Sequence, residues 1–159
     1  MAEWRTLPRL AQVGVRADAA GAAARRLGLP VEPDTAAAER DRRILWLGPD
    51  EWLVVAAPEE RPLLEVELRE ALGDELAAVV DVSAQRTAIE LSGPDALDVL
   101  GQGCSIDLHH SVFREGRCFQ TLLARAQVIL LPVAPQTCWI FVRSSFTDYV
   151  LAWLRDAAS

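Results

Sequence analysis

The stretch VVDVSAQRTAIELSGPDALDVLGQGCSIDL, residues 79–108, contains in one short segment the elements that decide the fold. Its apolar start is typical of a central strand that begins at about residue 76. In residues 86–91 polar and apolar side chains alternate, which predicts a second strand with one buried face. The Ser-Gly-Pro sequence at 92–94 favours a helix start, because proline presets the backbone angle of the first turn. The segment therefore predicts strand, turn, strand and helix in succession.

Two strand–helix steps are expected before this stretch. Asp18 is a favourable N-cap for an alanine-rich helix, and Gly28 suits the left-handed position that ends it. A Gly-Pro-Asp turn at residues 48–50 separates two strand-like runs, which is typical of a hairpin. In chain order we expect a strand at 10–17, a helix at 18–27, a polar loop at 31–41, hairpin strands at 43–47 and 51–57, and a helix at 62–72.

Short connections and a terminal helix are expected after the stretch. Three extended runs, at residues 118–124, 127–133 and 137–143, have the spacing of an antiparallel meander. Ser145 and Asp148 resemble a capping box at the start of the last helix. Apolar residues at helical spacing then form one stripe: Phe146, Tyr149, Val150, Trp153 and Leu154.

The order of elements is β-α-β-β-α-β followed by β-α-β-β-β-α. This order predicts an α+β fold with antiparallel sheets and helices on one face of each sheet. We expect a single domain over residues 1–159, built from two ferredoxin-like split-βαβ halves at about 8–75 and 76–157.

Composition excludes several classes of function. The chain has sixteen basic residues, all arginine, so it can form no lysine Schiff base and no Walker-type phosphate loop. A formal net charge of −7 and the lack of a basic cluster argue against nucleic-acid binding. No apolar run is long enough to span a membrane, and the first residues have no apolar signal region. A cytoplasmic location is therefore expected.

The thiols and imidazoles suggest neither a catalytic nor a metal site. Cys104, Cys118 and Cys138 are widely spaced among apolar neighbours, where cysteine is usually a small core residue in its reduced form. His109 and His110 are adjacent, and adjacent side chains of an extended segment point to opposite faces. At most one of them could serve a given site. We therefore predict no catalytic, cofactor-binding or metal-ligating residue in this chain.

Three tryptophans are candidates for contact with a partner protein, because tryptophan is enriched at interfaces. Trp46 and Trp52 flank the predicted hairpin turn, and Trp4 lies in a polar segment where no strand or helix is expected. Asp81 ends an apolar run, so its carboxylate needs a partner, and Arg86 is the nearest candidate in the sequence. A structural role is favoured for Asp81 over a ligand-binding one.

Four motifs in the same order and spacing indicate a family. They are GPDEWLVV at 48–55, DVSAQRTAIELSGPDAL at 81–97, GCSIDLH at 103–109 and VRSSFTDYVLAWL at 142–154. Together they resemble the gamma subunit of heterotetrameric sarcosine oxidase. The resemblance implies the fold of the folate-binding domain of the glycine-cleavage aminomethyltransferase family and a non-catalytic role beside alpha, beta and delta subunits. It also implies that FAD, FMN, NAD and tetrahydrofolate are held by those partners and that this chain holds no cofactor.

One departure from the related sequences concerns Ala84, which stands where they often carry histidine. A catalytic role for that histidine cannot be transferred to this chain. Two other functions stay open at this stage: a free-standing folate-binding or aminomethyltransferase-like one-carbon protein, and a homo-oligomeric binding module. In the complex that the resemblance implies, the reaction is the oxidative demethylation of sarcosine.

Overall fold

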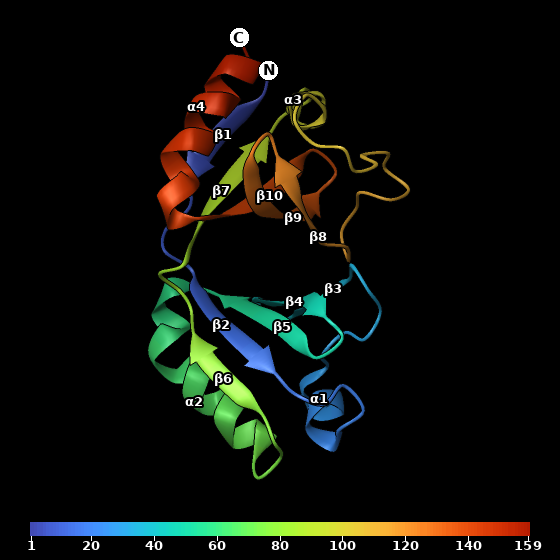
Figure 1. The fold of residues 1–159 in the computed structure, drawn as a ribbon, viewed down its shortest axis with the longest axis vertical. Helices are drawn as coiled ribbons and strands as arrows, with labels where there is room; N and C mark the ends of the chain where they lie inside the picture. The colour runs from blue at the N-terminus through green and yellow to red at the C-terminus, as the bar shows by residue number, and fades with distance from the viewer. The chain divides into compact units, whose positions relative to one another are not determined.

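The computed structural model describes residues 1–159 and divides them into two compact units. The first unit comprises residues 9–83, and the second comprises residues 1–8 together with 84–159. Each unit contains a five-stranded antiparallel sheet and two α-helices (Figure 1). The α+β class and the antiparallel sheets predicted from the sequence are therefore confirmed.

The sheet of the first unit has the strand order β3-β4-β5-β2-β6. Apart from the edge strand β3, this is the split-βαβ arrangement, in which each helix connects two strands that are not adjacent in the sheet. The elements are β2 (Ala11–Arg16), α1 (Ala22–Leu27), β3 (Ala36–Glu39), β4 (Arg42–Gly48), β5 (Glu51–Ala56), the 3₁₀ turn η1 (Pro58–Glu60), α2 (Arg61–Leu72) and β6 (Ala78–Asp81).

The sheet of the second unit has the order β1-β7-β10-β9-β8. Here the N-terminal strand β1 pairs with β7, the edge position that β6 holds beside β2 in the first unit. The second unit is thus a circularly permuted version of the same arrangement. Its elements are β1 (Glu3–Thr6), β7 (Arg86–Ser92), α3 (Ala96–Gly101), β8 (Phe119–Leu123), β9 (Ala126–Ala134), β10 (Thr137–Arg143), the 3₁₀ turn η2 (Ser144–Phe146) and α4 (Thr147–Ala157).

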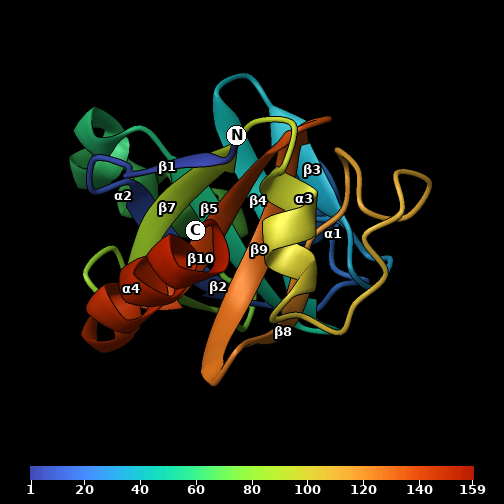
Figure 2. The same cartoon turned by 90° about the horizontal axis from the view of Figure 1, so that it is seen from above.

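Each unit has its own apolar core between one face of the sheet and the helices. In the second unit, Ile89 and Ile140 of the sheet share a buried cluster with Leu100 of α3 and Leu154 of α4. Figure 2 shows α3 and α4 on the same side of β7, β9 and β10. In the first unit, Leu64 of α2 belongs to the corresponding cluster, which also includes residues of α1, β2 and β5. The prediction that helices cover one face is confirmed.

The predicted apolar stripe of α4 is only partly buried. Val150 and Leu154 are 1% and 0% exposed, whereas Phe146 and Tyr149 are 41% and 38% exposed. The predicted capping box is wrong, because the helix begins after a 3₁₀ turn and no side chain caps its N-terminus. Gly28 is confirmed as the residue that ends α1, with a left-handed backbone (φ 67°).

Both edge strands that the sequence patterns missed are short. β1 lies in the segment expected to have no regular structure, and β3 lies within the polar loop expected at 31–41. Edge strands are often short and charged, and the outward residues of β1 are Glu3 and Arg5. The strand expected over 76–82 is β6, whose pairing with β2 places it in the first unit and not in the half expected at 76–157.

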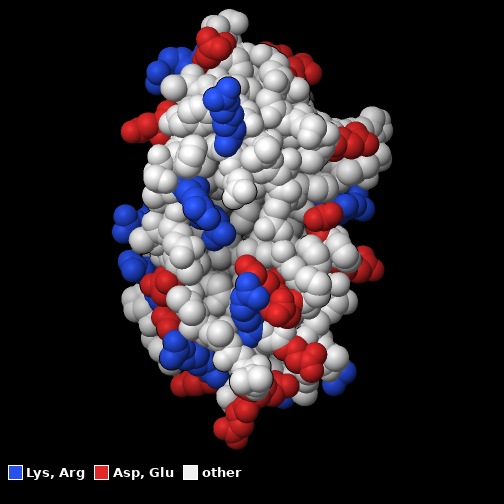
Figure 3. All heavy atoms as spheres, in the orientation of Figure 1, with Lys and Arg blue, Asp and Glu red and all other residues white.

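Acidic and basic side chains are interspersed over the face of the molecule in Figure 3. None of the four α-helices is long and apolar enough to cross a bilayer. The largest exposed apolar side chains of the first unit are those of Leu76, Leu63, Val31, Val80 and Val66, with 97%, 63%, 62%, 54% and 50% of their surface exposed.

Candidate functional site

The three candidate tryptophans do not share one environment. Trp52 of β5 has no exposed surface, and its indole Nε1 donates a hydrogen bond of 2.7 Å to the carbonyl oxygen of Pro30. Tryptophan is commonly buried when its N–H finds such a partner. The prediction that Trp52 contacts a partner protein is therefore corrected, since its side chain belongs to the core of the first unit.

Trp4 and Trp46 both pack partly against a core. Trp4 lies on β1 opposite Leu91 of β7 and packs against the core of the second unit. The expectation that no strand surrounds it is wrong. Trp46 lies on β4 opposite Trp52 and packs against the core of the first unit. Each keeps part of its side chain exposed, so contact with a partner stays a prediction for these two residues.

Asp81, at the end of β6, is held by hydrogen bonds to both of its carboxylate oxygens. The Ser83 hydroxyl and backbone N–H donate to Oδ1 at 2.6 and 3.0 Å, and Nε of Arg61 donates to Oδ2 at 2.9 Å. The hydrogen bonds from Ser83, more than Arg61, lower the pKa of Asp81 to about 2. Its partner is thus Arg61 of α2, and the predicted pairing with Arg86 is wrong.

We expect Asp81→Asn to destabilise the first unit in a pH-dependent way. The ionised carboxylate is favoured in the folded state, so its contribution is present above the ordinary pKa near 3.8 and is lost as the pH falls towards 2. Near neutral pH the variant should lose about 1–2 kcal/mol of unfolding free energy, and the difference should shrink below about pH 3. Urea unfolding between pH 2 and 7, with exposed Asp74→Asn as control, measures it. A difference independent of pH would contradict this account.

Two of the three cysteines are buried, whereas both histidines are exposed. Cys118 and Cys138 are buried, as expected of core cysteines, and burial raises the pKa of the Cys138 thiol. His109 and His110 are exposed, and their ring centroids are 4.1 Å apart. The expectation that they point to opposite faces is wrong, because they lie in a loop and not in an extended strand. Nowhere in the chain do three or more His, Cys, Asp or Glu side chains gather in a way that could hold a metal ion.

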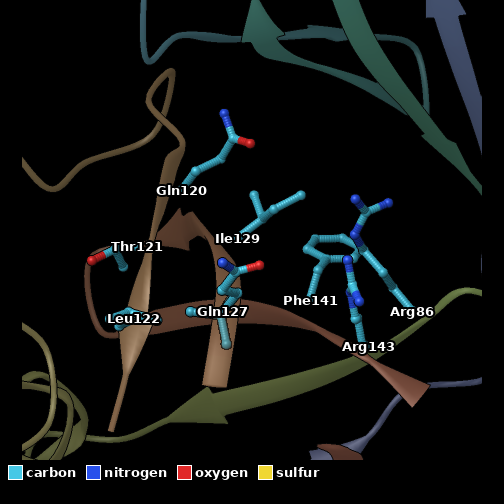
Figure 4. A pocket seen from close by; sticks show the side chains of 9 residues that line it. Arg86, Gln120, Thr121, Leu122, Gln127, Ile129, Phe141 and Arg143 are labelled. Atoms are coloured by element: carbon cyan, nitrogen blue, oxygen red, sulfur yellow. The ribbon is translucent and has the colours of Figure 1, made fainter. Parts of the chain in front are cut away.

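A pocket of about 540 Å³ lies on the second unit's sheet, on the face away from its helices. Ile129 and Phe141 line it, and they alternate along β9 and β10 with the core residues Leu130 and Ile140. Its rim is polar (Figure 4). The other lining residues are Arg86, Gln120, Thr121, Leu122, Gln127, Val128 and Arg143.

The two arginines of this pocket are brought together by strand register. Arg86 begins β7, Arg143 ends β10, and they are directly opposite each other in the antiparallel pair. Gln120 of β8 and Gln127 of β9 add two side-chain amides. Sequence reasoning missed this group, because its members come from four strands and belong to no short motif. Only the pairing of β7 with β10 places them on one surface.

Comparison with known proteins identifies the family. The family model described as "Sarcosine oxidase, gamma subunit family" matches residues 13–159. The sarcosine oxidase subunit gamma of Corynebacterium sp. strain P-1 is 43% identical over 155 residues, which cover 93% of this chain and 75% of that protein. The chain belongs to the sarcosine oxidase gamma subunit family. The homologous subunit from Arthrobacter sp. is 42% identical over 153 residues, covering 92% of this chain and 74% of that protein.

Solved structures support the same family assignment. A chain of the heterotetrameric sarcosine oxidase from Corynebacterium sp. U-96, in complex with pyrrole 2-carboxylate, superimposes with a TM-score of 0.91 at 36% identity. The match covers 98% of this chain and 83% of that one. The aminomethyltransferase of the Bartonella henselae glycine cleavage system superimposes with a TM-score of 0.73 at 13% identity, covering 96% and 45%. This second likeness establishes a shared fold.

Ala84 lies in the turn between β6 and β7, where its backbone is hydrogen-bonded to the segment that precedes α4. Its carbonyl oxygen accepts a hydrogen bond of 2.8 Å from the Ser144 hydroxyl, and the carbonyl of the next residue, Gln85, accepts one of 2.9 Å from the Ser144 N–H. These two hydrogen bonds link the residues just before β7 to the 3₁₀ turn η2 that precedes α4. The backbone at Ala84 therefore has a structural role that does not depend on the side chain.

Proposed function

We propose that this chain is the gamma subunit of a heterotetrameric sarcosine oxidase complex, located in the cytoplasm. In that complex it associates with alpha, beta and delta subunits and stabilises their assembly without catalysing the reaction itself. The observation that carries the proposal is the superposition, at a TM-score of 0.91 and over 98% of this chain, on a chain of such a heterotetramer. The 43% identity to a named gamma subunit supports it independently.

The proposed role assigns the redox chemistry to the partner subunits. FAD, FMN, NAD and tetrahydrofolate would be bound there, and sarcosine would be oxidatively demethylated there. A subunit that binds only the folded form of its partners raises their apparent stability by mass action. Trp4 and Trp46 are our candidates for this contact, since both combine an anchored ring with an exposed part.

Two experiments test this role directly. Purified alone, the chain is expected to show no flavin absorbance and no sarcosine oxidation. The three other subunits, co-expressed with it, should give a complex with a higher melting temperature than the same subunits expressed without it. Sarcosine oxidation by the isolated chain would contradict the non-catalytic role, and partner subunits that are equally stable without it would contradict the assembly role.

The second candidate function is folate binding by the chain itself. The fold shared with an aminomethyltransferase favours it, although that protein is more than twice as long as the part matched here. Titration of the isolated chain with tetrahydrofolate, followed by calorimetry, separates the two candidates. The assembly role predicts no binding at micromolar concentration, whereas folate binding predicts a saturable signal in that range.

A further inference from the structure

We propose that β6, the edge strand of the first unit's sheet, pairs with an extended segment of another subunit of the complex. The segment adds a sixth strand to the five-stranded sheet, with apolar side chains beside the edge and a basic side chain at one end. This contact presupposes the proposed function and locates it on one edge of the chain.

The backbone of β6 directs hydrogen-bonding groups away from the sheet. β6 ends the strand order, so only β2 pairs with it (Figure 1). The N–H of Val82 donates to the carbonyl oxygen of Gln12 at 2.8 Å, and in the same register Val80 also faces β2. Because the direction alternates along an antiparallel strand, the N–H and C=O groups of Val79 and Asp81 point outward. Such a row of groups is a template for a further strand.

Arg69 of α2 covers one acceptor of this edge without closing it. Its Nη2 donates to the carbonyl oxygen of Val79 at 2.9 Å and to Oε1 of Glu65 at 2.7 Å. The Arg69 side chain stays 62% exposed, so the guanidinium can keep its ion pair with Glu65 while an incoming N–H replaces it at Val79. The contact at Val79 also confirms that this carbonyl faces outward.

The side chains along this edge lack the charges that usually protect a free edge strand. Residues 76–80, LAAVV, include no charged side chain, and Leu76 and Val80 are 97% and 54% exposed. At the equivalent edge of the second unit, β1 has the exposed charged residues Glu3 and Arg5. Charged side chains keep an edge from pairing with other chains, whereas exposed apolar ones favour association. Of these two equivalent edges, β6 is therefore the one suited to receive a strand.

A hollow of about 430 Å³ between α2 and β6 leaves room for side chains of the added strand. Its exposed lining includes the small residues Gly73, Ala77 and Ala78. Every second side chain of the added strand would point to this face of the sheet, and the others would lie beside Val80. A helix bonds its own backbone groups and would leave the outward groups of β6 without partners. The occupant is therefore an extended segment.

The surface is acidic where β6 begins. A neighbouring hollow of about 630 Å³ is lined by three acidic residues, Asp18, Asp50 and Glu75, and by one basic residue, Arg16. Arg16 is itself paired with Oε2 of Glu51 at 2.6 Å. The surplus of negative charge is complementary to a lysine or arginine at one end of the partner's segment.

Amide hydrogen exchange at single-residue resolution tests the strand pairing in the co-expressed complex. In the isolated chain, the amides of Val79 and Asp81 should exchange faster than that of Val80, which faces β2. In the complex these two should slow at least about tenfold, because the partner's carbonyl groups accept them. A complex in which both keep their isolated rate overturns the strand pairing alone. Failure of the wild-type chain to form a complex refutes the proposed function and this contact together.

Two matched valine variants locate the contact. Val80→Lys places a charge at the edge, and Val66→Lys places the same charge on α2, at a residue that is 50% exposed and lines neither hollow. Each variant is co-expressed with the wild-type chain and the three other subunits. Mass spectrometry then compares the ratio of the two versions in the purified complex with their ratio in the lysate. Val80→Lys should be depleted at least about tenfold and Val66→Lys should be incorporated equally.

Circular dichroism melting of the isolated variants verifies that both fold. Equal incorporation of Val80→Lys, or equal depletion of both variants, would contradict the contact. Protection of Val79 and Asp81 in the isolated chain that disappears on dilution would mean that a second copy of this chain occupies the edge, and the proposal would be wrong.

Discussion

Removal of residues 1–7 is expected to destabilise the second unit strongly and to leave the sheet of the first unit protected. β1 forms four register pairs with β7, and the N–H of Leu7 donates to the carbonyl of Ala88 at 2.9 Å. The segment also contributes Ala2 and Trp4 to the core. Lost backbone hydrogen bonds at about 1 kcal/mol each and lost packing of a tryptophan predict a total of about 3–5 kcal/mol.

Hydrogen exchange followed by mass spectrometry measures this effect unit by unit. In the truncated chain, β7 and β10 should exchange faster, whereas β2 and β5 should keep their protection. A permuted chain that begins at Arg9 and carries residues 1–8 after Ser159 through a flexible linker is the matched control. The two termini lie close together in the second unit (Figure 1), so this chain should recover the protection. Unchanged exchange of β7 after truncation would contradict the role of β1.

Trp52→Ala is expected to cost the first unit about 3–5 kcal/mol of unfolding free energy, the range for a fully buried tryptophan. Trp52 has 0% of its surface exposed and packs between the sheet and the helices of that unit. The cavity left by the indole cannot close completely, because the surrounding residues are fixed by strand pairing. Urea denaturation followed by circular dichroism gives the change in free energy.

Trp52→Phe divides that cost into packing and hydrogen bonding. Phenylalanine keeps an aromatic ring but leaves the carbonyl of Pro30 without the indole donor. The expected loss is therefore intermediate, about 1–3 kcal/mol. Equal stability of Trp52→Ala and wild type would mean that the indole is not a core group and would restore it as a surface candidate.

The elements that the sequence predicts well are those with local causes. The hairpin of β4 and β5 and the meander of β8, β9 and β10 have turn residues between alternating runs, and both are present. β1 was missed because its pairing with β7 joins residues more than eighty positions apart and because its charged residues suit an edge. The permuted order of the second unit follows from that one long-range pair.

For the candidate site residues, too, the sequence predicts local needs but not the partners that the fold brings from distant segments. Asp81 was expected to need a partner, but nearness in the sequence pointed to Arg86, whereas the fold supplies Arg61 from α2. Trp52 flanks a turn in the sequence, but the register of β5 places its side chain in the core of the first unit. The pair of Arg86 and Arg143 depends on the alignment of two strands and cannot be recognised without it.

Affinity purification of the tagged chain from its native cell, with native mass spectrometry of the product, tests the central claim most directly. The predicted result is one assembly of four different chains in equal amounts, in which the three others are sarcosine oxidase subunits and the eluate absorbs as a flavoprotein. Recovery of the chain alone, or only as copies of itself, would contradict the claim that it is a subunit of that complex.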